Sequence, residues 1–420
     1  MCVEMKDSGI AWIGEIPKHW ETVKLGDLYS QRKEKVSDKD FPPLSVTMQG
    51  ILPQLETAAK TDDGDNRKLV RIGDFAINSR SDRRGSCGIS SYDGSVSLIN
   101  TVLVPRNEMN PVFYNWLFHT SLFADEYYKW GHGIVDDLWT TKWQEMKNIS
   151  VVAPNLEEQS RIANYLDKKC AEIDELITLQ EQMIAQLTTY KQAVITETVT
   201  KGLDPNVKMK DSGVEWIGEI PEHWDVTKLK NVLTLKTGTT PKAFEDINES
   251  DKLINWYTPS DILENGNIII SSERKLAKRV LDSEHISLYP GGSLMFVGIG
   301  ALAGKIGYAI QSGYSNQQIT ALIPKDVIGK FYYYYLIADK KRIRDNAFFT
   351  TLPIINNGYL GQVAVLYPSL SEQQTIATYL DQKCKEIDEL ISVKKEKIEK
   401  LKAYKKSVIY EYVTGKKQVN

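Results

Sequence analysis

The chain opens with MKDSGIAWIGEIPKHWETVKL at residues 5–25 and repeats it as MKDSGVEWIGEIPEHWDVTKL at residues 209–229. A second block follows each copy in the same order. It is LEEQSRIANYLDKKCAEIDELI at residues 156–177 and LSEQQTIATYLDQKCKEIDELI at residues 370–391. The chain therefore holds two tandem copies of one unit of roughly 200 residues, far longer than a solenoid repeat. Two like units on one chain indicate a target that has two parts.

Composition places the chain among ordinary globular proteins. Its 420 residues suffice for two to four domains, and its net charge of −3 does not by itself indicate nucleic-acid binding. The sequence has no apolar run of about 18 residues and a polar start, so we expect neither a membrane span nor a signal peptide. The four cysteines lie far apart and without metal-ligand spacing, which favours a reducing cytoplasm and no zinc site. They are Cys2, Cys87, Cys170 and Cys384.

The second block begins a long heptad pattern in each copy. A helix over about 157–200 would be roughly 65 Å long at 1.5 Å per residue. Two registers of seven predict its seam, the first with Ile173, Gln180, Leu187 and Val194, the second with Leu176, Met183 and Tyr190. The second copy gives the same pattern with Ile387, Leu390, Ile391, Ile398, Leu401, Tyr404 and Val408. Such a helix needs a partner, and we expect the two copies to form an antiparallel coiled coil.

The fronts of the two units, residues 1–153 and 206–366, differ more than their flanks. They still align, because Gly85, Gly88, Gly94 and Pro105 match Gly304, Gly307, Gly313 and Pro324 at one offset of 219. Short apolar runs at 69–77, 96–104, 293–297 and 319–323 predict strands, and 112–130 and 331–344 predict helices. The glycine and proline of residues 201–205 predict the end of the first helix. We therefore predict a mixed α+β fold with a curved sheet in each front.

These repeats resemble the specificity (S) subunit of type I restriction–modification enzymes. The pattern D-S-G-x-x-W-I-G-E-I-P-x-H-W at 7–20 and 211–224 is similar to that family's repeat start. The pattern P-x-L-x-E-Q-x-x-I-A-x-Y-L-D at 154–167 and 368–381 is similar to the start of its conserved helical region. The resemblance covers nearly the whole chain, and both patterns occur twice in the expected order.

The resemblance implies two α/β target recognition domains separated by two long helices that form an antiparallel coiled coil and act as a spacer. Each front would read one half of a split site in double-stranded DNA, and each repeat would dock one methyltransferase (M) subunit. Restriction (R) subunits would join through the M subunits. The chain itself would have no catalytic site and bind no cofactor, while its partners use S-adenosylmethionine, ATP and Mg²⁺. The implied domains are recognition domain 1 (1–155), helical region 1 (156–203), recognition domain 2 (204–368) and helical region 2 (369–415).

Several loops and one helix end carry residue types that contact DNA. Arginine forks suit guanine or phosphate, and Thr, Asn and Lys in polar loops suit phosphates and base edges. An ordinary solvated turn or helix face is the alternative at each place. The candidate DNA-binding residues are Arg80, Arg83, Arg84, Thr140, Thr141, Lys142, Lys305, Arg342, Arg344, Thr350, Thr351, Asn356 and Asn357.

Other features favour structure over chemistry. The Tyr332–Tyr335 run could stack on bases, but its counterpart Phe113–Trp116 favours a packed helix face. The repeat-start tryptophans and the equivalent Cys170 and Cys384 also favour packing. Residues 110–113 approximate a methyltransferase loop without its second proline, and residues 298–305 fail the P-loop spacing. The competing interpretations are a protein-only coiled-coil scaffold and a free-standing nuclease or methyltransferase.

Overall fold

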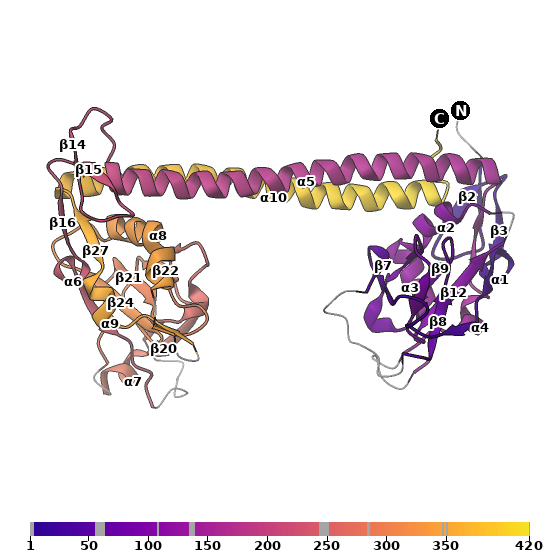
Figure 1. The fold of residues 1–420 in the computed structure, drawn as a ribbon, viewed down its shortest axis with the longest axis horizontal. Coiled ribbons are helices and arrows are strands. Elements are labelled where there is room, and N and C mark those ends of the chain that lie inside the picture. Colours follow the sequence, from indigo (N-terminus) through magenta and orange to yellow (C-terminus); the bar gives the residue numbers. More distant parts are fainter. Residues whose placement is uncertain are drawn as a thin grey trace. The chain divides into compact units, whose positions relative to one another are not determined.

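The computed structural model describes residues 4–54, 64–106, 109–133, 139–242, 252–283, 286–346, 348–349 and 352–419. It divides into two compact units, one formed by Met1–Glu181 with Lys395–Asn420 and the other by Gln182–Lys394. The predicted long helices are confirmed as α5 (Leu156–Lys201) and α10 (Leu370–Val413), which lie alongside each other in Figure 1. Each unit therefore combines one front with a segment of each long helix.

The first front is built from short antiparallel strands and small helices. Its strands are β1 (Met5–Asp7), β2 (Glu15–Pro17), β3 (Glu21–Lys24), β4 (Tyr29–Gln31), β5 (Lys35–Val36), β6 (Leu44–Thr47), β7 (Gly50–Pro53), β8 (Arg67–Val70), β9 (Phe75–Asn78), β10 (Cys87–Ile89), β11 (Gly94–Val96), β12 (Asn100–Pro105) and β13 (Ser150–Ala153). Its helices are α1 (Leu25–Leu28), the 3₁₀ turn η1 (Ser81–Arg83), α2 (Pro111–Phe118), α3 (Ser121–Lys129) and α4 (Trp143–Met146). The largest sheet has the order β10-β9-β12-β4, and a second has the order β11-β8-β5.

Two predicted strands of the first front were wrong in extent. The run 69–77 is split between β8 and β9, which belong to different sheets. A turn separates them, in which Gly73 has a φ of +88° and the Asp74 amide donates to the Arg71 carbonyl at 3.0 Å. The run 96–104 is split in the same way between β11 and β12. The expectation of one curved sheet therefore gives way to several small sheets packed together.

The second front repeats this plan with a larger sheet. Its strands are β14 (Met209–Asp211), β15 (Glu219–Pro221), β16 (Asp225–Lys228), β17 (Leu233–Thr237), β18 (Leu253–Tyr257), β19 (Asn267–Ile269), β20 (Arg274–Ala277), β21 (Ser293–Val297), β22 (Ile306–Ala309), β23 (Gly313–Ser315), β24 (Ile319–Pro324), β25 (Phe348–Phe349), β26 (Pro353–Ile354) and β27 (Ala364–Tyr367). Its helices are α6 (Leu229–Val232), the 3₁₀ turn η3 (Pro259–Asp261), α7 (Lys278–Ser283), α8 (Gly329–Asp345) and α9 (Asn357–Gln362). The main sheet has the order β17-β24-β21-β22-β19, with β19 and β22 parallel, and α8 packs on it (Figure 1).

Each front buries its core against both long helices at equivalent positions. In the first unit these are Ile162, Leu166 and Cys170 of α5 with Ile409 and Val413 of α10. In the second unit they are Ile376, Leu380 and Cys384 of α10 with Ile195 and Val199 of α5. Residues 332–335 are buried in the same core, so the prediction of a packed tyrosine face is confirmed. The apolar face of each helix thus serves both the other helix and a front.

Ion pairs between the helices repeat with the units. In the first unit, Lys405 Nζ lies 2.6 Å from Asp174 Oδ2, and in the second unit Lys191 Nζ lies 2.7 Å from Asp388 Oδ2. Asp174 is the repeat equivalent of Asp388, and Lys191 is the equivalent of Lys405. In the first unit the rings of Tyr165 and Tyr412 also meet at 4.4 Å. Since position 165 precedes 174 while 412 follows 405, the helices run antiparallel, as predicted.

One register of the predicted seam was wrong. Ile173 and Gln180 are buried as predicted, but Leu176, Met183 and Tyr190 are exposed. The second register instead runs through Ile177, Ile184 and Lys191, which are half-buried. Both rows are apolar over two turns, so the pattern alone did not separate them. The row that was assigned to the seam is therefore exposed on the helix surface.

Candidate nucleic-acid interface

Three loops of the first front are held together by backbone hydrogen bonds. We name them loop A (80–84), loop B (97–99) and loop C (139–142). Loop A is joined to loop C by the Ser81 amide, which donates to the Trp139 carbonyl at 3.1 Å. Ser79, directly before loop A, accepts from the Thr141 amide at 3.0 Å and donates to the Ile99 carbonyl at 3.2 Å. The two loops that the sequence proposed separately thus form one surface with a third.

The second front holds its equivalent loops in the same way. They are loop A (299–305), loop B (316–318) and loop C (352–357). The Gly300 amide donates to the Pro353 carbonyl at 3.2 Å. Gly298 accepts from the Ile355 amide at 2.7 Å and donates to the Gln318 carbonyl at 2.8 Å. At the offset of 219, the residues Gly298, Gly300 and Gln318 correspond to Ser79, Ser81 and Ile99. The same backbone hydrogen bonds therefore hold the three loops together in each front.

Loop A of the first front presents charge. Arg83 is the most exposed of its arginines, with 68% of its side chain accessible, and it lies 3.6 Å from Asp82. Arg84 is held by an ion pair to Asp125, and its guanidinium lies 5.5 Å from the centre of the Tyr128 ring. The Arg80 amide donates to Asn78 Oδ1 at 3.0 Å, which fixes the start of the loop. Arg83 is therefore the arginine that is best placed to reach a ligand.

Lys305 of the second front has an internal partner. Only 13% of its side chain is exposed, and its Nζ lies 3.4 Å from Glu264 Oε2. Lys340 binds the same carboxylate at 2.7 Å. The hydrogen bond from Lys340, followed by the charges of both lysines, keeps the pKa of Glu264 below its usual value despite some desolvation. The one lysine of loop A in the second front is therefore nearly buried and engaged with Glu264, whereas loop A of the first front presents Arg83 at its surface.

The two arginines at the end of α8 bind groups of the protein itself. The guanidinium of Arg342 binds both carboxylate oxygens of Asp339, with Nε 2.7 Å from Oδ1. Asp339 is buried, and this desolvation raises the pKa of its carboxyl in spite of the arginine. Arg344 Nη2 donates to the Ala301 carbonyl at 3.3 Å and so supports loop A. These contacts give both predicted residues a structural role.

Loop C divides into exposed and buried candidates. The Thr141 side chain is fully buried, and its hydroxyl donates to the Tyr127 carbonyl at 2.9 Å, so it cannot reach a ligand in this conformation. Thr140 pairs with both Arg80 and His132 through isolated β-bridges, whereas Lys142 is exposed. The burial of Thr141 corrects its prediction as a contact residue.

In the second front, the candidates Thr350 and Thr351 lie outside the described residues. Asn356 caps α9 by accepting from the Tyr359 amide at 2.8 Å. Asn357 accepts from the Thr320 hydroxyl at 2.8 Å and donates to the Thr237 hydroxyl at 2.9 Å. Both asparagines therefore fix the frame of loop C.

Sequence reasoning missed loop B. In the first front it reads Ser97-Leu98-Ile99 and in the second Asn316-Gln317-Gln318. Both copies form the same turn, in which a backbone amide donates to the carbonyl three residues earlier. The Asn100 amide donates to the Ser97 carbonyl at 3.0 Å, and the Ile319 amide donates to the Asn316 carbonyl at 3.1 Å. Both show the same order of one half-exposed and two exposed residues. The loop has no charged residue. The sequence signal that could have identified it is the replacement of two apolar residues, Leu98 and Ile99, by two glutamines at the equivalent positions of the second front.

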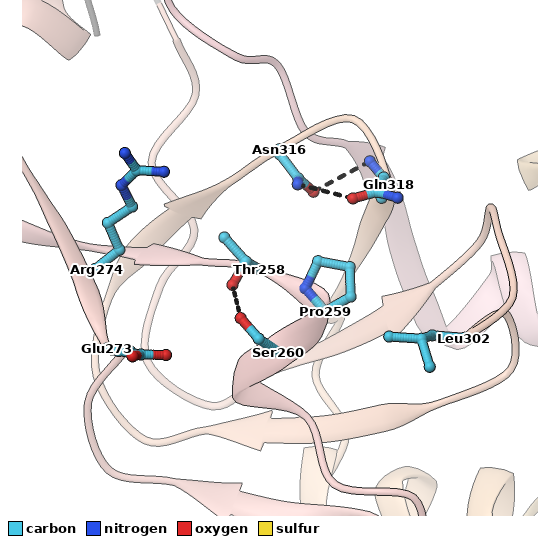
Figure 2. A pocket seen from close by; sticks show the side chains of 8 residues that line it. All are labelled: Thr258, Pro259, Ser260, Glu273, Arg274, Leu302, Asn316 and Gln318. Carbon is cyan, nitrogen blue, oxygen red and sulfur yellow. Dashed lines mark hydrogen bonds between the residues drawn. The ribbon is translucent and has the colours of Figure 1, made fainter. Parts of the chain in front are cut away.

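A polar pocket of about 610 Å³ opens beside loop B of the second front. Figure 2 shows Asn316 and Gln318 on one side, Leu302 of loop A on another, and Thr258 with Ser260 between them. The hydroxyls of Thr258 and Ser260 lie 2.7 Å apart, and Thr258 also donates to Asp261 Oδ2 at 2.9 Å. Glu273 and Arg274 also line the pocket, so hydroxyl, amide and charged groups that can form hydrogen bonds converge there with the apolar Pro259 and Leu302.

The long helices expose apolar side chains at repeated positions. Leu176 and Leu179 of α5 correspond to Leu390 and Val393 of α10, and Tyr404 corresponds to Tyr190. Each unit thus presents one aliphatic pair and one tyrosine, because Leu176, Leu179 and Tyr404 belong to the first unit and the others to the second. Exposed apolar side chains that lie close together mark contacts with other proteins more often than isolated ones do.

Within the residues that the structure describes, no group of three His, Cys, Asp or Glu side chains could hold a metal ion. In the same residues, no helix is long and apolar enough to cross a membrane. The thiols of Cys87, Cys170 and Cys384 are buried, and desolvation raises their pKa to about 12, 11 and 11. These cysteines are therefore packing residues and not nucleophiles.

Known proteins match the chain along almost its whole length. Residues 221–403 match the family described as Type I restriction modification DNA specificity domain. The Type I restriction enzyme MjaVIII specificity subunit of Methanocaldococcus jannaschii is 26% identical over 425 residues, covering 96% of this chain and 94% of that protein. The MjaIX specificity subunit of the same organism is 31% identical over 188 residues, covering 44% of this chain and 42% of its own.

Solved structures share the fold. A chain in a structure described as "Structural basis underlying complex assembly and conformational transition of the type I R-M system" aligns with a TM-score of 0.74, at 16% identity, over 95% of this chain and 98% of its own. The HsdS subunit from Thermoanaerobacter tengcongensis aligns with a TM-score of 0.54, at 19% identity, over the same shares. The predicted fold class is thereby confirmed. Residues 221–403 thus match the Type I restriction modification DNA specificity domain, and the chain is similar along nearly its whole length to a type I restriction enzyme specificity subunit.

Proposed function

We propose that the chain is the DNA-reading subunit of a type I restriction–modification complex and that each front reads one half of an asymmetric bipartite site. The observation that carries this proposal is the pair of three-loop surfaces. Their backbone hydrogen bonds are equivalent, while their exposed side chains differ: the first front presents arginine and aliphatic groups, and the second front presents glutamine amides with aliphatic groups. A duplicated frame with unlike side chains is what two different half-sites require.

The exposed apolar side chains that recur on the helices support the docking of two like partners. We assign them to two M subunits, one for each repeat, with R subunits joining through the M subunits. The long helices then act as the spacer between the half-sites. Because equivalent side chains recur in each unit, the same partner surface can bind each unit.

The chain has a non-catalytic role in this proposal. It binds no cofactor, whereas S-adenosylmethionine, ATP and Mg²⁺ are used by the partner subunits for DNA methylation and cleavage. The thiol of Cys87 is buried with a raised pKa, and Glu264 and Asp339 are engaged in ion pairs, so we assign no catalytic role to these groups.

Single-molecule methylome sequencing of cells that express the chain with its M and R subunits tests the proposal. We expect methylation within one asymmetric motif with an unread gap, and none when this chain is omitted. A protein-only scaffold predicts methylation that does not depend on the chain's fronts. A free-standing enzyme predicts methylation or cleavage by the purified chain alone. Either of these results would contradict the proposal.

A further inference from the structure

Loop B of the second front contains an amide pair whose orientation is fixed by the backbone. Asn316 Oδ1 accepts from the Gln318 amide at 3.1 Å, and a backbone N–H can only donate. The other atom of the Asn316 amide is therefore its NH₂ group, which donates to Gln318 Oε1 at 3.2 Å. This hydrogen bond identifies Gln318 Oε1 as the acceptor and places Nε2 on the opposite side of the amide (Figure 2).

Gln318 still offers both kinds of hydrogen-bonding group to a ligand. Its Oε1 has a second lone pair, and its Nε2 has two N–H donors. The side chain is exposed at the edge of the pocket that contains Thr258 and Ser260. Gly300 of loop A lies beside it, since a Cβ at Gly300 would be at an ordinary van der Waals distance of 3.6 Å from Gln318 Nε2. The exposed edge thus presents one acceptor next to one donor in a defined order.

This order matches one base in the major groove. Adenine presents its N6 amino group, a donor, beside N7, an acceptor, and a glutamine amide binds both at once. Guanine presents two acceptors at this edge, cytosine presents a donor, and thymine presents an acceptor and a methyl group. Because only adenine satisfies the acceptor and the donor of Gln318 together, the other bases leave one polar group without a partner.

We propose that Gln318 reads an adenine in the second half-site and that Asn316 is the positioning residue that fixes its amide. The inference rests on the proposed function and adds the base and the residues. The equivalent loop of the first front supports it by contrast. There Ile99 occupies the position of Gln318 and Leu98 precedes it, both exposed and apolar, which suits contact with the methyl group of thymine. The same loop position therefore reads different chemistry in the two half-sites.

Methylome sequencing of Gln318 variants in the three-subunit system tests the inference. We expect Gln318→Ala to lower discrimination at one adenine of one half-site by roughly 10-fold or more, and all other positions to keep their wild-type preference. Gln318→Glu, which can only accept, should shift the preference at that position toward cytosine. Asn316→Ala should weaken the preference for the same adenine, because Gln318 then loses its fixed orientation.

Two controls separate the possible failures. Ile99→Ala, at the equivalent position, should change the other half-site, and Asn231→Ala, an exposed amide on α6, should change neither. An unchanged motif in Gln318→Ala, an equal loss at all positions, or a second half-site without adenine on either strand would overturn the inference while leaving the proposed function standing. Absence of any chain-dependent bipartite motif in the wild type would instead overturn the proposed function.

Discussion

The indole N–H of Trp224 donates to Oε1 of Glu372 at 2.9 Å and so joins the two duplicated blocks of the second unit. His223 lies 2.8 Å from the same oxygen. In the first unit, Trp20 donates to Glu158 at the equivalent place, at 3.3 Å. Trp20 and Trp224 thus connect the first residues of each front to the beginning of the long helix that follows it.

Glu372→Gln should destabilise the second unit in a pH-dependent way. Partial desolvation disfavours the Glu372 carboxylate, but hydrogen bonds from Trp224, His223 and Ser369 outweigh it and lower its pKa from 4.5 to about 2. A lowered folded pKa stabilises the folded state above pH 4.5, and this contribution is lost as the pH falls toward 2. We expect a loss of about 1 kcal/mol at pH 7, discounted because the side chain is partly exposed.

Urea unfolding of the full chain at pH 7 and at pH 3 measures this difference. The free energies of unfolding of the wild type and the variant should lie closer together at the lower pH, because the stabilisation from the ionised Glu372 decreases below pH 4.5. Glu158→Gln is the matched variant in the first unit. A difference between wild type and Glu372→Gln that grows as the pH falls would contradict the assignment.

Arg83→Ala should relax or weaken the reading of one half-site and leave the other unchanged. Arg83 is the most exposed arginine of loop A, whereas Arg84 is held by Asp125. Arg83→Lys separates two modes of contact, since lysine keeps the charge but loses the planar fork. If the lysine variant fails like alanine, Arg83 reads guanine; if it behaves like wild type, Arg83 binds phosphate. Equal relaxation of both half-sites would rule out the loop A assignment.

Substitution of the exposed aliphatic pair on α10 should remove one M subunit from the complex. Leu390→Ser with Val393→Ser changes the second unit, and Leu176→Ser with Leu179→Ser is the matched change in the first. Each double variant should lower the mass of the purified chain–M complex by one M subunit, and the quadruple variant should bind none. Circular dichroism should show unchanged helix content, because these side chains lie outside the helix seam. Two bound M subunits in the quadruple variant would contradict the docking assignment.

The sequence predicted elements that depend on local pattern and missed choices that depend on tertiary partners. The long helices followed from their heptads, but Leu176 and Ile177 were equally apolar candidates for the second seam register. The ion pair of Lys191 with Asp388 and the packing of the fronts decide between these two registers. Residues 69–77 formed one apolar run, yet Gly73 and Asp74 turn the chain between two sheets.

The candidate surface was located from the sequence only in part, for a similar reason. Charge located loop A of the first front, and in the second front charge led to Lys305 and Arg342, which bind Glu264 and Asp339. The Arg342 pair had a local signal, an aspartate three residues earlier on one helix face. Loop B has no charged residue, and only its backbone hydrogen bonds to Ser79 and Gly298 include it in the candidate surface.

Insertion of one heptad into each long helix should lengthen the unread gap of the DNA site. The insertion belongs after Leu187 in α5 and beside Ser392 in α10. Lys191 pairs with Asp388 in antiparallel helices, so the residue four positions earlier on α5 faces the residue four positions later on α10. Seven residues add about 10 Å of helix, which corresponds to about three base pairs at roughly 34 Å per turn of 10 base pairs. Methylome sequencing should then show both half-sites unchanged and the gap longer by about three base pairs.

A two-residue insertion in each helix is the control, because it breaks the seven-residue register and should abolish methylation without defining a new gap. An unchanged gap in the heptad variant would exclude the spacer role of α5 and α10.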